Sequence, residues 1–192
     1  MAHKITYYMY YNSNNIAEKI LKEGYSTGLV LALDESASRY DSRIWIVDNS
    51  GSMQLGDGSR IIKEAKKGGK QKSIDCTRWD EMAETVKYHA QMASTLDCPT
   101  VFQLINDPGQ PATPQRFSVC EHGTMNAQEE VSKAAQIMST VMPSGVTPLT
   151  QHIRDVKEYI SGRADELKRR GKIVVIILAT DGMISCIAIL VV

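Results

Sequence analysis

The sequence predicts an α/β fold, in which a doubly wound, mostly parallel sheet is flanked by helices in three layers. Two continuous apolar runs, 44–47 and 173–178, have the β-branched composition of parallel strands buried on both faces. Segments with the apolar spacing of amphipathic helices alternate with strand-like runs along the chain, which is the order typical of this fold class. A length of 192 residues suits a single domain of ordinary size.

The composition excludes several classes of protein. Lysine plus arginine and aspartate plus glutamate number 22 each, so the chain lacks the net positive charge of a general nucleic-acid or membrane-surface binder. The four cysteines are widely separated and show no CxxC spacing, which argues against a zinc site or a dithiol redox motif. The amino end lacks the pattern of a signal peptide, so we expect a cytoplasmic protein, with the nucleus also open.

The apolar stretch 173–192 is close to the ~20 residues that span a bilayer. Asp181 lies near its middle, where a carboxylate costs roughly 2.5–3.5 kcal/mol to insert. Gly182 favours a turn at the same point. We therefore expect no transmembrane helix and no membrane partner.

The spacing of apolar residues and the positions of capping residues predict the other elements. Thr77 and Asp80 are spaced as a capping box. Asn126 is expected to cap the next helix, and Thr147 with Pro148 to cap and begin the last one. The run 116–121 alternates in polarity and is expected at a sheet edge. The expected helices are 15–23, 29–40 (whose start could also be strand), 77–96, 126–139 and 147–170, and the further strands are 100–107 and 116–121.

Polar side chains follow the two strongest strands. Asp48, Ser50 and Ser52 come directly after 44–47, Asp181 follows 173–178, and Thr147 precedes the last helix. In open parallel sheets, ligand sites form at the carboxyl ends of the strands, so these five residues could converge. Carboxylates and hydroxyls are hard oxygen ligands, which suit magnesium or manganese better than zinc or copper. The sequence therefore predicts a divalent-cation site.

Three segments around these residues resemble one family. The segment 47–53, VDNSGSM, is similar to the Asp-x-Ser-x-Ser motif of the metal-ion-dependent adhesion site in von Willebrand factor A (vWA) domains. The segment 145–149, GVTPL, is similar to the threonine loop of that family, and 179–182, ATDG, to its distal aspartate. Taken singly, these segments could be a plain turn, a helix cap and a turn dipeptide. Their co-occurrence in the family's order favours the resemblance, which covers roughly 43–182.

The resemblance implies a vWA-type, Rossmann-like fold and a role for each residue. Ser50, Ser52 and Thr147 would give hydroxyl oxygens to Mg²⁺ (or Mn²⁺), while Asp48 and Asp181 would balance its charge directly or through water. The sixth position would accept a carboxylate from an acidic residue of a protein partner. The expected function is therefore a metal-dependent protein–protein interaction module.

Two departures from the family set the expected domain boundaries. Some two dozen residues, 54–76, follow the serine motif and are expected to form a β-hairpin insertion around Gly68-Gly69. Only a short apolar tail follows the distal aspartate, so we expect a domain that is truncated at its carboxyl end, with a chain that completes it or a tail that folds back as the alternatives. An exposed apolar edge there would favour association. We expect an N-terminal helical extension over 1–42 and the vWA-like domain over 43–192.

The lysines of the insertion are candidate contacts for an acidic partner, although a solvated surface hairpin is the plainer interpretation. They are Lys63, Lys66, Lys67, Lys70 and Lys72.

Two other functions compete with the interaction module. The first is a truncated scaffolding fragment without metal-dependent activity. The second is a metal-dependent phosphoryl hydrolase, which would need a general base that the sequence does not offer. No combination of serine, histidine and acid reads as a nucleophile elbow, and no GxxxxGK phosphate loop occurs in the sequence, so we expect no enzymatic activity.

Overall fold

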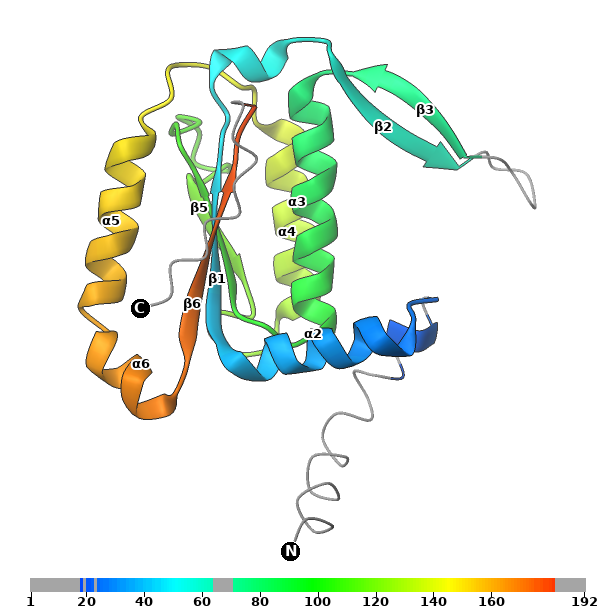
Figure 1. Ribbon diagram of the computed structural model, residues 1–192. Helices are drawn as coiled ribbons and strands as arrows, with labels where there is room; N and C mark the ends of the chain where they lie inside the picture. The colour runs from blue at the N-terminus through cyan, green and yellow to red at the C-terminus, as the bar shows by residue number, and fades with distance from the viewer. Residues whose placement is uncertain (1–17, 19, 23, 64–70, 182–192) are drawn as a thin grey trace, which may run out of the picture.

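The computed structural model describes residues 18, 20–22, 24–63 and 71–181 (Figure 1). The expected Gly68-Gly69 turn, the lysines Lys66, Lys67 and Lys70, the tail 183–192 and most of the expected helix 15–23 lie outside these ranges. Within the described ranges, no helix is long and apolar enough to cross a membrane.

A four-stranded sheet forms the middle layer, in the order β5-β4-β1-β6. Strand β1 (Tyr40–Val47) pairs in parallel with β4 (Thr100–Leu104) on one side and with β6 (Ile173–Ala179) on the other. Strand β5 (Arg116–Val119) pairs antiparallel with β4 and lies at the edge, as its alternating polarity predicts. The mostly parallel α/β sheet flanked by helices is therefore confirmed. Strand β1 begins before the expected domain boundary at 42/43, which falls inside it.

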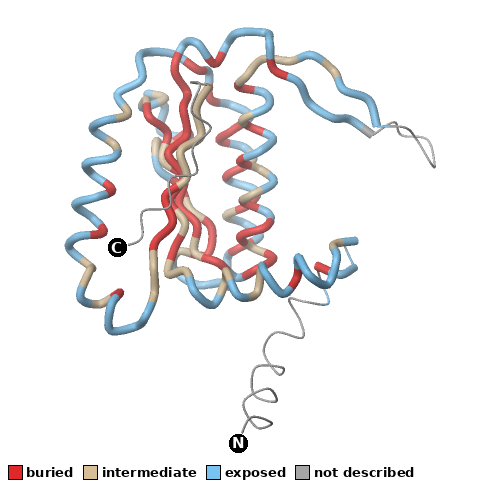
Figure 2. The backbone as a smooth tube through the Cα atoms, viewed as in Figure 1, coloured by how far each residue is buried: buried red, intermediate tan, exposed pale blue. Residues whose placement is uncertain are grey.

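Helices α3 (Arg78–Thr95) and α4 (Ala127–Thr140) cover one face of the sheet (Figure 1). Their inner faces pack on Trp45, Val47 and Phe102 of the central strands in one buried cluster. Figure 2 shows buried red segments alternating with exposed blue segments along these helices. The expected capping box of α3 is present, because Asp80 accepts from the Thr77 backbone while Thr77 caps the Asp80 N–H. Asn126 occupies the expected N-cap position of α4, but its side chain makes no capping hydrogen bond.

The opposite face is covered by α5 (Leu149–Ser161) and α6 (Ala164–Arg170), where we expected one helix. Helix α5 ends at Ser161, and the Arg163 side chain then donates to Asp41 of β1. Helix α5 buries only Val156 and Ile160 (Figure 2), and Ile153, expected on its inner face, is exposed. A cleft of about 660 Å³ lies between α5 and the sheet.

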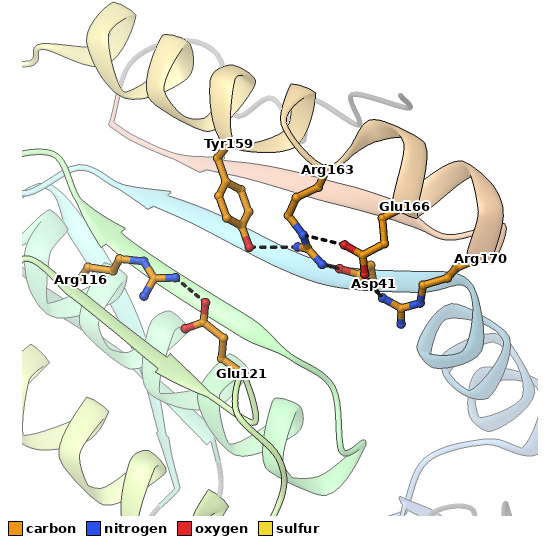
Figure 3. Close-up of polar contacts among 7 residues, drawn as sticks. All are labelled: Asp41, Arg116, Glu121, Tyr159, Arg163, Glu166 and Arg170. Carbon is orange, nitrogen blue, oxygen red and sulfur yellow. Dashed lines mark hydrogen bonds and ion pairs between the residues drawn. The ribbon is translucent and has the colours of Figure 1, made fainter.

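An ion-pair network joins α6 to β1 close to the point where α5 ends and α6 begins (Figure 3). The Asp41 side chain is only 6% exposed and accepts hydrogen bonds from Arg163 Nη2 at 3.1 Å and Arg170 Nη1 at 2.7 Å. Arg163 also donates to the Tyr159 hydroxyl, and both arginines pair with Glu166. The second helix is therefore oriented by charge pairing as well as by burial of Leu167.

Helix α2 (Thr27–Arg39) confirms the expected helix over 29–40. It crosses the end of the α3–α4 layer that lies farthest from the carboxyl end of β1 (Figure 1). Its Val30 joins a small buried cluster with Met92, Leu96 and Cys98 of α3 and the loop after it. The amino-terminal helix is therefore packed onto the same body as the sheet.

The insertion contains two antiparallel strands, β2 (Gly58–Lys63) and β3 (Gln71–Cys76), which form a sheet of their own. Figure 1 shows this hairpin extending from the loop end of the molecule beyond the start of α3. Gly58 permits its close attachment, because a Cβ there would come within 2.7 Å of the Thr77 carbonyl oxygen. Lys72 is exposed on β3.

Candidate functional site

The predicted site residues are delivered to one end of the sheet by neighbouring elements. Strand β1 leads to Asp48, and the parallel neighbour β6 leads to Asp181. The backbone N–H of Asp48 donates to the Ala179 carbonyl at 2.8 Å, so the two strand ends remain joined up to the first site residue. A 3₁₀ turn, η1 (Gly51–Gln54), then carries Ser52 over the sheet end. Parallel pairing therefore places both aspartates at the same edge.

Asp48 is 1% exposed and is held by hydrogen bonds at both carboxylate oxygens. Its Oδ1 accepts the Ser50 backbone N–H at 2.9 Å, and its Oδ2 accepts the Thr180 hydroxyl at 2.8 Å. Each carboxylate oxygen has two acceptor positions, so each retains one that these bonds do not use. The carboxylate is thus fixed in orientation and can still accept a water or a cation.

Ser50 and Ser52 bring their hydroxyls together beside this carboxylate. The two Oγ atoms form a hydrogen bond with each other at 3.2 Å, and Ser50 is buried whereas Ser52 is exposed. Magnesium binds oxygen at 2.0–2.1 Å in an octahedron, so two adjacent ligand oxygens lie about 2.9 Å apart. The observed separation is close to that value. The pair therefore fits the spacing required of two adjacent ligands on one small divalent ion.

Asp181 is 87% buried at its side chain and is already engaged by a residue that the sequence did not single out. Arg78, the first residue of α3, donates from Nη1 to Asp181 Oδ2 at 2.7 Å. The same guanidinium donates from Nε and Nη2 to the two carboxylate oxygens of Asp57, each at 2.6 Å. Arg78 therefore bridges the loop after η1 to the end of β6.

The charges of this bridge shift three ionisation equilibria. Burial opposes ionisation of Asp181, but hydrogen bonds from Ser52 and Arg78 outweigh it and lower the pKa of this carboxyl. The hydrogen bonds from Arg78 also lower the pKa of Asp57. In return, the two carboxylates raise the pKa of the Arg78 guanidinium. All three groups are therefore charged at neutral pH.

Thr147 lies on a neighbouring loop that is tied to the serine motif through the backbone. The Gly51 N–H donates to the Gly145 carbonyl at 3.1 Å, and the Ser144 N–H donates to the Asn49 carbonyl at 2.8 Å. Thr147 itself is exposed, and in the described part of the chain its hydroxyl makes no hydrogen bond to the other four predicted residues. It also does not cap α5, whose N-cap position is Pro148.

Asn49 and Asn106 set the position of the threonine loop. The buried Asn49 amide accepts the Asn106 N–H at 2.8 Å and donates to the Asn106 carbonyl at 2.9 Å. The Asn106 amide in turn donates to the Val146 carbonyl at 2.8 Å. Gly145 has φ +84°, and a Cβ there would lie 3.0 Å from Asn106 Oδ1. Two asparagine side chains thus join the loops that follow β1 and β4 to the threonine loop, and Gly145 permits their close approach.

Sequence reasoning missed the roles of five residues of this arrangement, which are Asn49, Asp57, Arg78, Asn106 and Thr180. Asn49 occupies a position that the serine motif leaves variable, although an asparagine directly after a predicted buried strand was a usable sign. Asn106 likewise follows a strand end. For Arg78, no local pattern exists, because Asp57 and Asp181 become its neighbours only when the loop, helix and strand are assembled.

The donor set decides which chemistry this site can support. Across the described ranges, no group of three or more histidine, cysteine, aspartate or glutamate side chains could hold a metal ion. The site instead offers the carboxylates of Asp48 and Asp181 at adjacent strand ends, and the hydroxyls of Ser50 and Ser52, of which Ser52 hydrogen-bonds Asp181. Such a set is hard and holds few charges, so it suits an ion that keeps some water ligands.

Comparison with known proteins adds no relative to this description. No protein-family model, no curated protein and no solved structure matches the chain.

Proposed function

We propose that this chain is a vWA-type interaction module, which binds a carboxylate of a partner protein through a divalent cation. The observation that supports this most directly is the 3.2 Å pair of Ser50 and Ser52 hydroxyls beside the oriented Asp48 carboxylate. When bound, Mg²⁺ or Mn²⁺ would supply a positive charge with an open coordination position for the partner's oxygen. Ser50, Ser52, Asp48 and Asp181 would hold the ion, and the threonine loop would bring Thr147 to it.

The chain's own residues would orient the ion's ligands and leave room for the partner. Asp48 is pre-oriented by the Ser50 N–H and the Thr180 hydroxyl, so little ordering is needed when an ion binds. Ser52 and Thr147 are exposed, which leaves the outer side of the site open to a partner. A carboxylate that meets the ion is neutralised and oriented at once, so the interaction is expected to require the metal and one acidic partner residue.

Metal binding is tested by titrating Mn²⁺ into the purified chain and measuring heat or the free-ion spin-resonance signal. One saturable site is expected in the wild type, with affinity reduced at least about tenfold in Asp48→Ala and Ser50→Ala, because each removes a direct or charge-balancing oxygen. Ser132→Ala is the matched control, since Ser132 is exposed on α4 and bonds only within its helix. Absence of a saturable site in the wild type would contradict the proposal and favour the scaffolding alternative.

Partner chemistry is tested with a displayed library of random peptides in the presence of Mg²⁺. Selected peptides are expected to contain an aspartate or glutamate, to lose binding in a chelator, and to lose it when that acid is changed to its amide. Selected peptides that bind equally well in a chelator would contradict a metal-mediated contact. Metal-dependent hydrolysis of a generic phosphoester, abolished by Asp48→Ala, would instead support the hydrolase alternative.

A further inference from the structure

The bridge from Asp57 through Arg78 to Asp181 places a fixed positive charge on a predicted metal ligand. The guanidinium lies 2.7 Å from Asp181 Oδ2 and 2.6 Å from both oxygens of Asp57. The Arg78 side chain is 29% exposed and that of Asp181 is 13% exposed, so water screens this contact only in part. A cation approaching Asp181 therefore meets an arginine that already holds the carboxylate.

We infer that Arg78 sets the metal affinity of the site by competing with the divalent ion for Asp181. This inference rests on the proposed function, because it assigns the control of the same site. In the metal-free chain, the guanidinium satisfies the buried carboxylate that would otherwise be left without a counter-charge. When an ion binds, Asp181 exchanges its bond to Arg78 for the ion or a water bound to it, and the guanidinium keeps Asp57 as its partner.

Asp57 is the residue that would hold the Arg78 guanidinium once Asp181 has bound the ion. Its side chain is 59% exposed and accepts two parallel hydrogen bonds from Arg78, so it can retain the guanidinium by itself. The backbone N–H of Arg78 donates to the Leu55 carbonyl at 2.9 Å, which joins the start of α3 to the loop that carries Asp57, so the exchange is proposed as a movement of side chains. Asp57 thus draws Arg78 away from Asp181, and its negative charge adds to the attraction of the ion.

The two ends of the bridge have opposite expected effects on metal binding. Removing the charge at Arg78 frees Asp181 and removes a repulsion from the ion, so Arg78→Gln is expected to bind Mn²⁺ at least about fivefold more tightly than the wild type. Removing the charge at Asp57 leaves Arg78 to Asp181 alone, so Asp57→Asn is expected to bind it more weakly. Arg78→Lys keeps the charge but cannot make the two parallel bonds to Asp57 together with the bond to Asp181, so its affinity for Mn²⁺ is expected to lie between those of the wild type and Arg78→Gln.

These three variants are compared by Mn²⁺ titration in the intact chain, with Arg169→Gln as the control. Arg169 is exposed on α6, at the end of the molecule away from the site, so its removal changes net charge equally without touching the bridge. Thermal melting without metal accompanies each titration. Arg78→Gln is expected to melt lower than the wild type without metal and to gain more stability from Mn²⁺.

The outcomes separate this inference from the proposed function. Tighter binding in Arg78→Gln and weaker binding in Asp57→Asn, with Arg169→Gln unchanged, supports the competition. If the wild type binds Mn²⁺ and Arg78→Gln binds it equally or more weakly, the competition is overturned while the proposed function stands. If neither the wild type nor Arg78→Gln binds Mn²⁺, both are overturned.

Discussion

Asn49 shows how one side chain can position a neighbouring loop. Its buried side-chain amide bonds both the N–H and the carbonyl of Asn106. Its backbone carbonyl accepts the Ser144 N–H. The side-chain amide that makes both bonds to Asn106 is strongly fixed, because leaving either of its buried polar atoms without a partner would be costly. The distance between the serine motif and the threonine loop is therefore set by hydrogen bonds that do not involve the predicted ligands.

Gly145 provides a test of this loop arrangement. Its φ of +84° is unfavourable for any residue with a Cβ, and that atom would crowd the Asn106 amide at 3.0 Å. Gly145→Ala is expected to destabilise the fold by about 1–2 kcal/mol in denaturant unfolding. Gly56→Ala is the control, since a Cβ there meets nothing within 4 Å and its φ is not positive. An equal effect of both changes would contradict the account of the loop.

His89 predicts a pH dependence of stability. Burial, together with the charge of Arg43, lowers the pKa of this imidazole, whose ring lies 4.5 Å from that of Trp45. Because the folded pKa is depressed, the unfolded state binds more protons as the pH falls below about 6.5, so stability is lost from there toward the folded pKa. His89→Gln is expected to weaken the dependence of the unfolding free energy on pH below about pH 6.5. At about pH 8, where this imidazole is neutral in both the folded and the unfolded state, His89→Gln and the wild type should show the same slope of unfolding free energy against pH.

At the scale of elements, burial made the strands predictable. The runs 44–47 and 173–178 became the adjacent parallel strands β1 and β6 because both faces of each are covered. Strand β1 extends back to Tyr40 through polar residues, which periodicity could not include, since Asp41 is buried against arginines distant in sequence. The elements set by local apolar pattern were predicted, and those set by distant charge pairing were not.

The last helix was mispredicted for the same reason. Its apolar spacing continued from Leu149 to Leu167, but the structure divides it into α5 and α6. Arg163, in the break, donates to Asp41, which lies far away in the sequence. Thr147 was expected as a cap and stands one residue outside that position. The convergence of Asp48 and Asp181 was predictable from parallel strand ends, whereas Arg78 was not.

Asp41 is the test at the scale of elements. Asp41→Asn removes the charge that Arg163 and Arg170 share, which leaves two partly buried guanidinium groups without their main acceptor. The expected loss of unfolding free energy is about 1–3 kcal/mol, reduced from the value for a fully buried pair because both arginines are partly exposed. Asp75→Asn, an exposed aspartate on β3, is the matched control. Equal stability of the Asp41 variant and the wild type would show that α6 is held by apolar packing alone.

At the scale of the whole molecule, the residues of the proposed site all lie in loops and turns at one end of the sheet. Strand ends, η1, the threonine loop and the start of α3 all contribute residues there, whereas α2 and α6 lie toward the opposite end (Figure 1). The body that fixes these loops is the sheet with its α3–α4 layer, which contains the largest buried cluster. A ligand at this end is therefore expected to stabilise the entire fold.

Thermal melting with and without Mg²⁺ tests the central claim most directly. A ligand that binds only the folded chain adds about 2.7 kcal/mol at a hundredfold excess over its Kd, which for this length corresponds to a Tm rise of roughly 5–10 °C. We expect that rise in the wild type and its loss in Asp48→Ala, whose own Tm serves as the reference for each condition. An identical Tm in saturating Mg²⁺ and in chelator, measured on a cooperatively melting wild-type chain, would contradict the metal-dependent site.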